Sequence, residues 1–159
     1  MNYAHIKKSD IANGPGVRVS LFVSGCTHHC KGCFNPETWD FDGGMELPND
    51  IKGQIIKAIS ANGVMRNFSV LGGEPLCDEN KELVDEIVTA VRITYPDIKI
   101  YLWTGYEYDT LIEKCDDNIN HILNQIDILI DGPFVLAERD LTLELRGSHN
   151  QKIHKLTNR

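Results

Sequence analysis

The sequence predicts an α/β fold, in the form of an open, incomplete parallel (βα) barrel of about five units. Four short runs of apolar and β-branched residues alternate with segments of helical periodicity, which is the pattern of a parallel sheet covered by helices. The runs are continuously apolar, as expected for strands that are buried on both faces. A complete barrel needs ~250 residues, so the 159 residues of this chain allow about five strand–helix units.

Glycine-containing turns follow the predicted strands. The first run, VRVSLFVSG, is β-branched and lies between Gly16 and Gly25. The four predicted strands span residues 17–25, 67–75, 98–106 and 126–134, and they end in SGC, GGEP, WTGY and DGPF. Ligands of parallel α/β folds bind at the carboxyl ends of the strands, so we expect these four turns to meet at one site. The segment LTLELRG (141–147) is a candidate edge strand.

Helical periodicity appears in three segments between these strands. Residues 49–63 place isoleucines at helical spacing after a capping Asn49 or Asp50, and Gly63 ends the segment. Residues 79–96 have one apolar face, acidic residues early and a proline at the end. Residues 108–125 predict one or two short helices.

Composition limits the class of protein. Apolar residues make up 42% and charged residues 25% of the chain, as in soluble globular proteins, and the length suits a single domain over residues 1–159. The net charge of −7 argues against sequence-independent binding to nucleic acid or anionic lipid. The N-terminus has no secretory signal and no run is long enough to cross a membrane, so we expect a cytoplasmic protein. Five cysteines in a reducing compartment favour metal or redox chemistry over disulfides.

Three of the cysteines lie in one loop, SGCTHHCKGCFNP (24–36). Cys26 and Cys30 enclose three residues, and Cys30 and Cys33 enclose two. Three thiolates can hold three corners of a cubane cluster and leave the fourth iron open, as catalytic metal sites require. Cys77 and Cys115 match no ligand spacing, and we treat both as non-ligands.

Two other interpretations of the loop remain open at this point. A zinc site would use the three cysteines with His28 or His29, but both histidines lie inside the three-residue gap, closer than the usual ligand spacing. The cysteines would otherwise be unliganded core residues, which is unusual for a loop rich in Gly, Lys and His. The spacing favours an iron–sulfur cluster over both.

Several motifs together resemble a known family. The C-x3-C-x2-C loop after the first strand resembles the radical S-adenosylmethionine (SAM) superfamily, and GGEP (72–75) looks like its SAM-binding turn. NGPGVRVSLFVSGC (13–26) and CFNPETW (33–39) are similar to the signature of enzymes that activate glycyl-radical enzymes. The short chain, with WTGY, LIDGPF and LRGSHNQ, resembles the branch that activates the anaerobic (class III) ribonucleotide reductase. The resemblance covers residues 13 to about 151.

The resemblance implies a radical SAM fold and a mechanism. Cys26, Cys30 and Cys33 would bind a [4Fe–4S] cluster, and the methionine half of SAM would chelate the open iron. Cleavage of SAM by the reduced cluster would give a 5′-deoxyadenosyl radical, which would take a hydrogen atom from a glycine of the large subunit of the reductase. A flavodoxin-like protein would supply the electron. The same-chemistry alternative is an activase of another glycyl-radical enzyme, such as pyruvate formate-lyase. The alternative of a different class is a small zinc- or iron–sulfur-binding module without catalysis.

The remaining site residues follow from the same resemblance. Gly72 and Gly73 would let the backbone approach SAM, so we expect a bulky residue at position 73 to block SAM while the cluster still assembles. The side chain of Glu74 would accept a hydrogen bond from the amino end of SAM. The family often has an aromatic residue directly before the third cysteine, but here Gly32 takes that place, so adenine contacts would come from the backbone around Gly32 and from Phe34.

The least specific candidates have structural alternatives. Thr104 and Asp131 end two predicted strands and would contact SAM or a cation beside it. The alternatives are that Thr104 is a structural hydroxyl and that Asp131 caps the next turn. Arg18 would anchor the partner's glycine loop or pair with a local carboxylate. His28 and His29 would tune the cluster or be solvated. The C-terminal stretch 145–155, with donors on Arg146, His149 and Asn150, would dock the partner or only close the domain.

Overall fold

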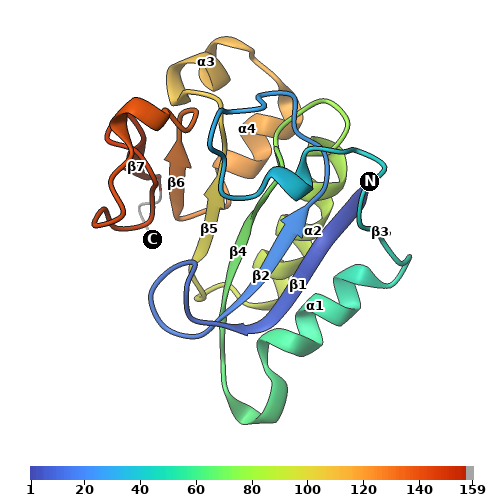
Figure 1. The fold of residues 1–159 in the computed structure, drawn as a ribbon. Helices are drawn as coiled ribbons and strands as arrows, with labels where there is room; N and C mark the ends of the chain where they lie inside the picture. Colours follow the sequence, from blue (N-terminus) through green and yellow to red (C-terminus); the bar gives the residue numbers. More distant parts are fainter. Residues whose placement is uncertain (157–159) are drawn as a thin grey trace.

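Four parallel strands form the centre of the sheet in the computed structural model, which describes residues 1–156 (Figure 1). They are β2 (Arg18–Val23), β4 (Asn67–Gly72), β5 (Ile100–Trp103) and β6 (Ile128–Asp131). Each pairs in parallel with the next in that order. The four strands predicted from the apolar runs and their parallel direction are therefore confirmed.

Antiparallel strands extend the sheet at both edges. β1 (Asn2–Asp10) pairs with β2, and β3 (Met45–Glu46) pairs with β1. At the other edge β7 (Lys152–Lys155) pairs with β6. The order is β3-β1-β2-β4-β5-β6-β7, so the sheet is mixed, with four parallel strands where about five were expected.

The candidate edge strand at 141–147 was wrong. This segment forms turns and bends, and Leu145 has a left-handed φ of 64° that no regular strand contains. The carbonyl of Leu145 accepts a hydrogen bond of 2.7 Å from Trp103 Nε1, which holds the segment across the end of β5. The edge strand beside β6 is β7, whose main chain pairs with β6 over four residues.

The helices follow the predicted segments. They are α1 (Ile51–Ile59), α2 (Lys81–Thr94), α3 (Tyr108–Glu113) and α4 (Asp117–Leu123), with short 3-10 turns η1 (Pro36–Thr38), η2 (Ala61–Gly63) and η3 (Leu136–Glu138). The segment 108–125 forms two helices because Cys115 adopts a φ of 49° between them. The Asp116 carboxylate then caps α4 by accepting from the amide of Ile119 at 3.0 Å.

The two faces of the sheet have different roles. Figure 1 shows α1, α2 and α4 on one side, and the core lies between them and alternate strand residues such as Val19, Leu21, Val70 and Leu102. The residues of opposite orientation include Phe22, Leu71 and Trp103, and these line a cavity on the other face. The helices therefore stabilise one face and leave the second for chemistry.

Arg18 stabilises the open face instead of binding a partner. Its side chain has no exposed area, and its guanidinium donates to Ser69 Oγ at 2.7 Å and to three main-chain carbonyls. It also lies 4.2 Å from the ring centre of Tyr101. Burial lowers the pKa of this guanidinium to about 10. Both predicted roles of Arg18, an anchor for a partner and an ion pair with a local carboxylate, are wrong, because the group is enclosed by carbonyls.

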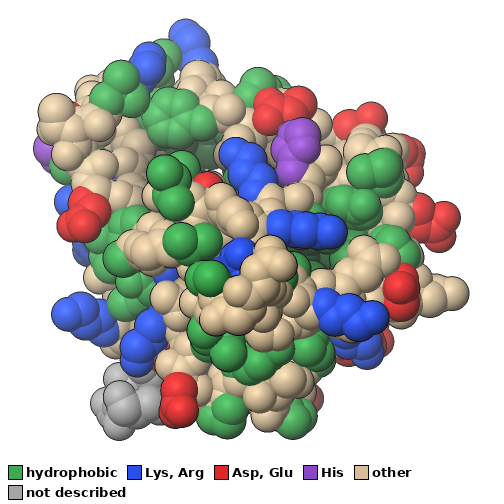
Figure 2. Space-filling view, turned by 90° about the horizontal axis from the view of Figure 1, so that it is seen from below, with side chains coloured by type: hydrophobic (Ala, Val, Ile, Leu, Met, Phe, Trp, Pro, Cys, Tyr) green, Lys and Arg blue, Asp and Glu red, His purple; other side chains and the backbone are tan. Residues whose placement is uncertain are grey.

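The surface shows both signs of charge. Seen from below, toward the amino ends of the parallel strands, Figure 2 shows Lys and Arg side chains interspersed with acidic and hydrophobic ones. Among residues 1–156 no helix has the length and hydropathy that a membrane span requires.

Candidate functional site

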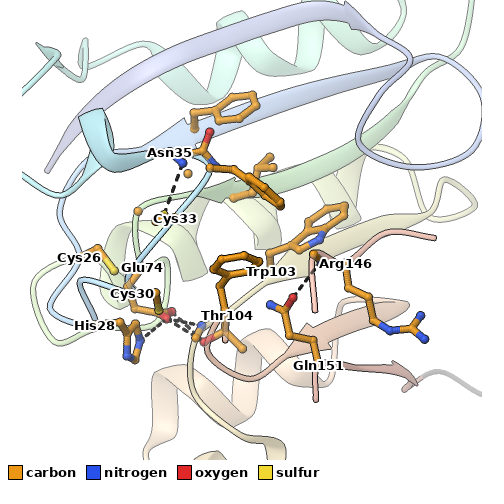
Figure 3. A pocket seen from close by; sticks show the side chains of 18 of the residues that line it. Cys26, His28, Cys30, Cys33, Asn35, Glu74, Trp103, Thr104, Arg146 and Gln151 are labelled. Carbon is orange, nitrogen blue, oxygen red and sulfur yellow. Dashed lines mark hydrogen bonds and ion pairs between the residues drawn. The ribbon is translucent and has the colours of Figure 1, made fainter. Parts of the chain in front are cut away.

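The four strand-end turns meet at one cavity, as predicted. The cavity has a volume of about 490 Å³ and lies at the carboxyl ends of the parallel strands (Figure 3). Its lining residues from the four turns are Cys26, Cys30, Cys33, Gly72, Gly73, Glu74, Thr104, Gly105, Gly132 and Phe134. Segments up to about a hundred residues apart in the sequence thus supply one site.

The cysteine loop is held by its main chain. The amide of Gly25 donates to the carbonyl of Thr38 at 2.7 Å, and that of Cys26 donates to the carbonyl of Trp39 at 3.1 Å. Left-handed φ values of 46° at His29 and 78° at Gly32 turn the chain back on itself. These turns bring the three cysteines to the same cavity, although no two of them are adjacent in sequence.

All three thiols of the loop are free and half-buried. Cys33 Sγ accepts a hydrogen bond of 3.3 Å from the amide of Asn35, of the kind that also stabilises a thiolate. Burial raises the pKa of the Cys26 thiol, and a bound cation would favour its thiolate form. The loop therefore offers three soft ligands toward a space large enough for a further group.

The GGEP turn is bonded to the cysteine loop. The amide of Gly73 donates to the carbonyl of Val23 at 2.8 Å, and the amide of Glu74 donates to the carbonyl of Gly25 at 2.7 Å. A Cβ on Gly73 would collide with the carbonyl oxygen of Gly25 and lie 2.9 Å from its carbon. This geometry argues against the expectation that a bulky residue at position 73 would leave cluster assembly unaffected, because Gly25 directly precedes Cys26.

Gly72 has a similar packing role. Its φ is 102°, and a Cβ there would lie 2.8 Å from the carbonyl oxygen of Val23. Only glycine adopts this conformation without strain so close to a neighbouring strand. Gly72 thus allows the ends of β4 and β2 to approach each other, and Gly73 does the same for the GGEP turn and the cysteine loop.

Glu74 is at the centre of the site and 1% exposed. Its carboxylate accepts hydrogen bonds from His28 Nε2 at 2.7 Å, from the amide of Gly105 at 2.7 Å and from the amide of Leu76 at 2.9 Å. The hydroxyl of Thr104 contacts both carboxylate oxygens, at 3.0 and 2.8 Å. Figure 3 shows this convergence of His28 and Thr104 on Glu74.

Of the two predicted adenine residues, Phe34 lines the cavity and Gly32 does not. Phe34 is 53% exposed, and its ring is 5.0 Å from that of Phe134 at a tilt of 48°. A Cβ on Gly32 would lie 2.9 Å from Leu136 Cδ1, so this position also packs against the segment after β6. Phe34 and Phe134 together form an aromatic wall, in which Phe34 was predicted from the sequence and Phe134 was not.

Asp131 does not reach this cavity. Its carboxylate accepts from the amides of Tyr108 at 2.8 Å and Lys152 at 3.1 Å and lies 3.1 Å from His154 Nε2. These partners belong to a separate, smaller pocket on the far side of β6. Neither predicted role of Asp131 describes these contacts, because its carboxylate bonds to the start of α3 and to β7 instead of the SAM cavity or the turn that follows β6.

The other histidine and cysteines have structural partners. The His29 ring stacks on Trp39 at 4.6 Å with an interplanar angle of 9°. Cys77 is buried, its thiol donates to the carbonyl of Glu74 at 3.2 Å, and burial raises its pKa to about 12. Cys115 is exposed and remote from the lining residues.

The C-terminal stretch closes the cavity. The side-chain oxygen of Gln151 accepts from the amides of Gly147 at 2.9 Å and Ser148 at 3.1 Å, and its nitrogen donates to the carbonyl of Gly132 at 3.1 Å. Arg146 and Gln151 both line the cavity. The closing role of this stretch is therefore visible, and its docking role stays a prediction.

Sequence reasoning missed several lining residues. Lys7, Phe22 and Leu71 enter the cavity through their strand positions, and Trp39, Trp103 and Gln151 enter from loops or strand ends. Strand alternation would have identified Trp103 once the inner face was known. No local pattern marks Trp39 or Gln151, because long-range contacts place them.

A mononuclear metal site is not formed in the part of the chain that the structure describes. No three His, Cys, Asp or Glu side chains within residues 1–156 are arranged around a single ion. His28 binds Glu74 and His29 stacks on Trp39, so both zinc-ligand candidates have other partners.

Comparisons with known proteins identify relatives over the whole chain. The family described as "4Fe-4S single cluster domain" matches residues 12–154. The anaerobic ribonucleoside-triphosphate reductase-activating protein of Vibrio cholerae is 42% identical over 158 residues, which is 99% of both chains. Proteins of the same name from Haemophilus influenzae and Escherichia coli K12 are 40% and 38% identical, and the matches cover 98% of this chain and 98% and 99% of theirs.

Proposed function

Because the chain belongs to the family of anaerobic ribonucleoside-triphosphate reductase-activating proteins and contains a 4Fe–4S domain, we propose that it is a radical SAM activase that creates the glycyl radical of the anaerobic ribonucleotide reductase. The observation that carries the proposal is the convergence of the three-cysteine loop and the GGEP turn on one cavity.

The residues present fit a [4Fe–4S] cluster with one open iron. Three free thiols from one loop border the cavity, and they are Cys26, Cys30 and Cys33. The nearest other ligand-type side chains, His28 and Glu74, bind each other. The fourth coordination position is thereby left for a small molecule, as in open catalytic metal sites.

When bound, the cluster and SAM supply a one-electron cleavage of the sulfonium that ends in removal of a hydrogen atom from a glycine of the reductase. The chain's own residues contribute orientation and shielding. Phe22, Leu71 and Trp103 form an apolar floor that limits water beside the reacting carbon. Phe34 and Phe134 offer a wall against which adenine can stack.

The backbone of the GGEP turn is the proposed seat of the methionine half of SAM. The amides of Gly73 and Glu74 already donate to Val23 and Gly25, so carbonyl oxygens of the turn are the groups suited to an ammonium. Thr104, at the end of β5, lies beside the same turn through its bonds to Glu74. We propose that the carbonyl oxygens of the GGEP turn and Thr104 contact SAM, in place of the contact that was predicted from Asp131.

The partner's glycine loop would enter over the face of the sheet that no helix covers. This face supports the finer proposal of a partial radical SAM barrel within a single domain, open on one side. Arg146 and Lys7 at the cavity offer donors to main-chain carbonyls of an entering segment. The free thiols suit a reducing compartment, so the proposal includes a location in the cytoplasm. The proposal also includes a flavodoxin-like protein as the external electron donor.

The test is anaerobic co-incubation of the reconstituted protein with the large subunit of the anaerobic reductase, SAM and dithionite. We expect a glycyl-radical EPR signal on the reductase, and none with the Cys30→Ala variant. Pyruvate formate-lyase serves as the control for the alternative partner. A signal on that enzyme but not on the reductase would contradict the proposal.

A further inference from the structure

His28 occupies a slot built for its ring. It comes from the cysteine loop, between Cys26 and Cys30, and its side chain is only 18% exposed. The ring lies edge-on to Tyr106 with centroids 4.7 Å apart and an interplanar angle of 76°. A Cβ on Gly105 would lie 2.5 Å from His28 Cδ2 and 2.7 Å from Nε2, so only glycine at 105 leaves room for the ring.

The slot ends at the carboxylate of Glu74, which joins three segments. His28 donates from the cysteine loop, Thr104 and Gly105 donate from the end of β5, and Leu76 donates from the turn itself. The hydroxyl of Thr104 is within 3.0 Å of both oxygens. Each of these donors belongs to a segment that lines the cavity or directly follows one that does.

The acceptor capacity of Glu74 is already used. An ionised carboxylate offers about four lone-pair positions, and four protein groups occupy them here. A side chain that is 1% exposed also offers very little surface to a bound molecule. The expected contact from the Glu74 side chain to the amino group of SAM therefore has no place in this arrangement.

We propose that Glu74 is a positioning residue that, through His28, locks the cysteine loop to the GGEP turn and to the end of β5. The inference rests on the proposed function for the identity of the two ligands. The reacting groups must be held to within about half an ångström, and supporting hydrogen bonds commonly supply such precision. The three residues between Cys26 and Cys30 thus have a role, because they let His28 reach the slot.

A double-mutant cycle between His28 and Gly105 tests the coupling without the reductase. The variants are His28→Ala, Gly105→Ala and the double variant, and the readouts are iron content, the dissociation constant of SAM, and the EPR spectrum of the reduced cluster with SAM. Gly105→Ala adds no polar group and expels the His28 ring. We expect iron content to persist in all three, and SAM affinity to fall about tenfold in each single variant.

The double variant shows whether the effect of Gly105→Ala on SAM binding depends on the His28 ring. If Gly105→Ala weakens SAM binding by displacing the His28 ring, it causes no further loss of affinity when the ring is already absent. The double variant should then bind SAM with the same dissociation constant as His28→Ala. Equal losses from Gly105→Ala in both backgrounds would overturn the inference, as would full SAM affinity in Gly105→Ala alone. If wild-type protein binds neither cluster nor SAM, the proposed function fails instead.

A second variant covers misfolding of Gly105→Ala. His28→Gln keeps a donor nitrogen near the position of Nε2, and we expect it to recover most of the SAM affinity that His28→Ala loses. The cluster EPR spectrum with SAM should return with it. Affinity as poor as in His28→Ala would contradict a hydrogen-bonded lock. Gly53→Ala is the matched glycine control, because nothing lies within 4 Å of its added Cβ.

Discussion

Substituting Gly73 by alanine should destabilise the protein before any ligand binds. The added methyl would collide with Gly25 O and lie 2.9 and 3.0 Å from the carbon and nitrogen of that residue, none of which can move without the loop. Overpacking of this kind costs about 1–3 kcal/mol. The bonds from Gly73 to Val23 and from Glu74 to Gly25 would stretch, at about 1 kcal/mol each.

The net loss is smaller than these terms together, because alanine restricts the unfolded chain by about 0.4–1 kcal/mol. We expect the free energy of unfolding to fall by about 2–4.5 kcal/mol. For a chain of this length that lowers Tm by roughly 4–18 °C. Iron incorporation should also fall, because the displaced residue precedes Cys26.

Anaerobic thermal unfolding of the apoprotein, followed by circular dichroism, measures this effect. Gly53→Ala in α1 is the control, and its Tm should stay level or rise, since alanine favours a helix by about 0.5–1 kcal/mol over glycine. A Gly73→Ala protein with the Tm and iron content of wild type would refute the packing of the two loops described here.

Two further predictions concern the cysteines and a buried carboxylate. Alanine at any one cysteine of the loop should abolish cluster binding, whereas Cys77→Ser and Cys115→Ser should keep wild-type iron and sulfide; equal loss in either of the last two would contradict the three-ligand site. Burial alone raises the pKa of Asp10, but hydrogen bonds from Ser20, Ala12 and Asn13 outweigh it and hold that pKa below its usual value. Asp10→Asn should cost about 1.5–3 kcal/mol near neutral pH. Because the pKa of Asp10 is lower in the folded state, its stabilising contribution is complete above the unfolded pKa and is lost as the pH falls through the folded pKa. The stabilities of the variant and the wild type should therefore converge in acid. A stability difference that stays constant with pH would contradict the lowered pKa of Asp10.

The sequence predicted those parts of the fold that depend on local pattern. The apolar runs marked β2, β4, β5 and β6, and the glycine turns after them marked the cavity, because parallel strands align their carboxyl ends. β1 was missed because NYAHIKKSD is largely polar, and it becomes a strand only by pairing with β2. The sequence of such a polar segment does not by itself show that it pairs with a neighbouring strand.

Side-chain roles at the strand ends were harder to predict. Thr104 directly follows β5 and Asp131 is the last residue of β6. The hydroxyl of Thr104 nevertheless bonds to Glu74, whereas the carboxylate of Asp131 bonds to the start of α3. His28 looked like a loop histidine, and its partner Glu74 lies 46 residues away. Such pairings depend on how loops meet in space, which spacing and composition do not encode.

The most direct test of the central claim follows the hydrogen atom. The protein is incubated anaerobically with SAM, dithionite and reductase large subunit in which glycine carries deuterium at Cα, and the 5′-deoxyadenosine formed is measured by mass spectrometry. We expect one deuterium per 5′-deoxyadenosine formed, in proportion to the glycyl radical seen by EPR. Unlabelled 5′-deoxyadenosine alongside a full glycyl-radical signal would contradict it.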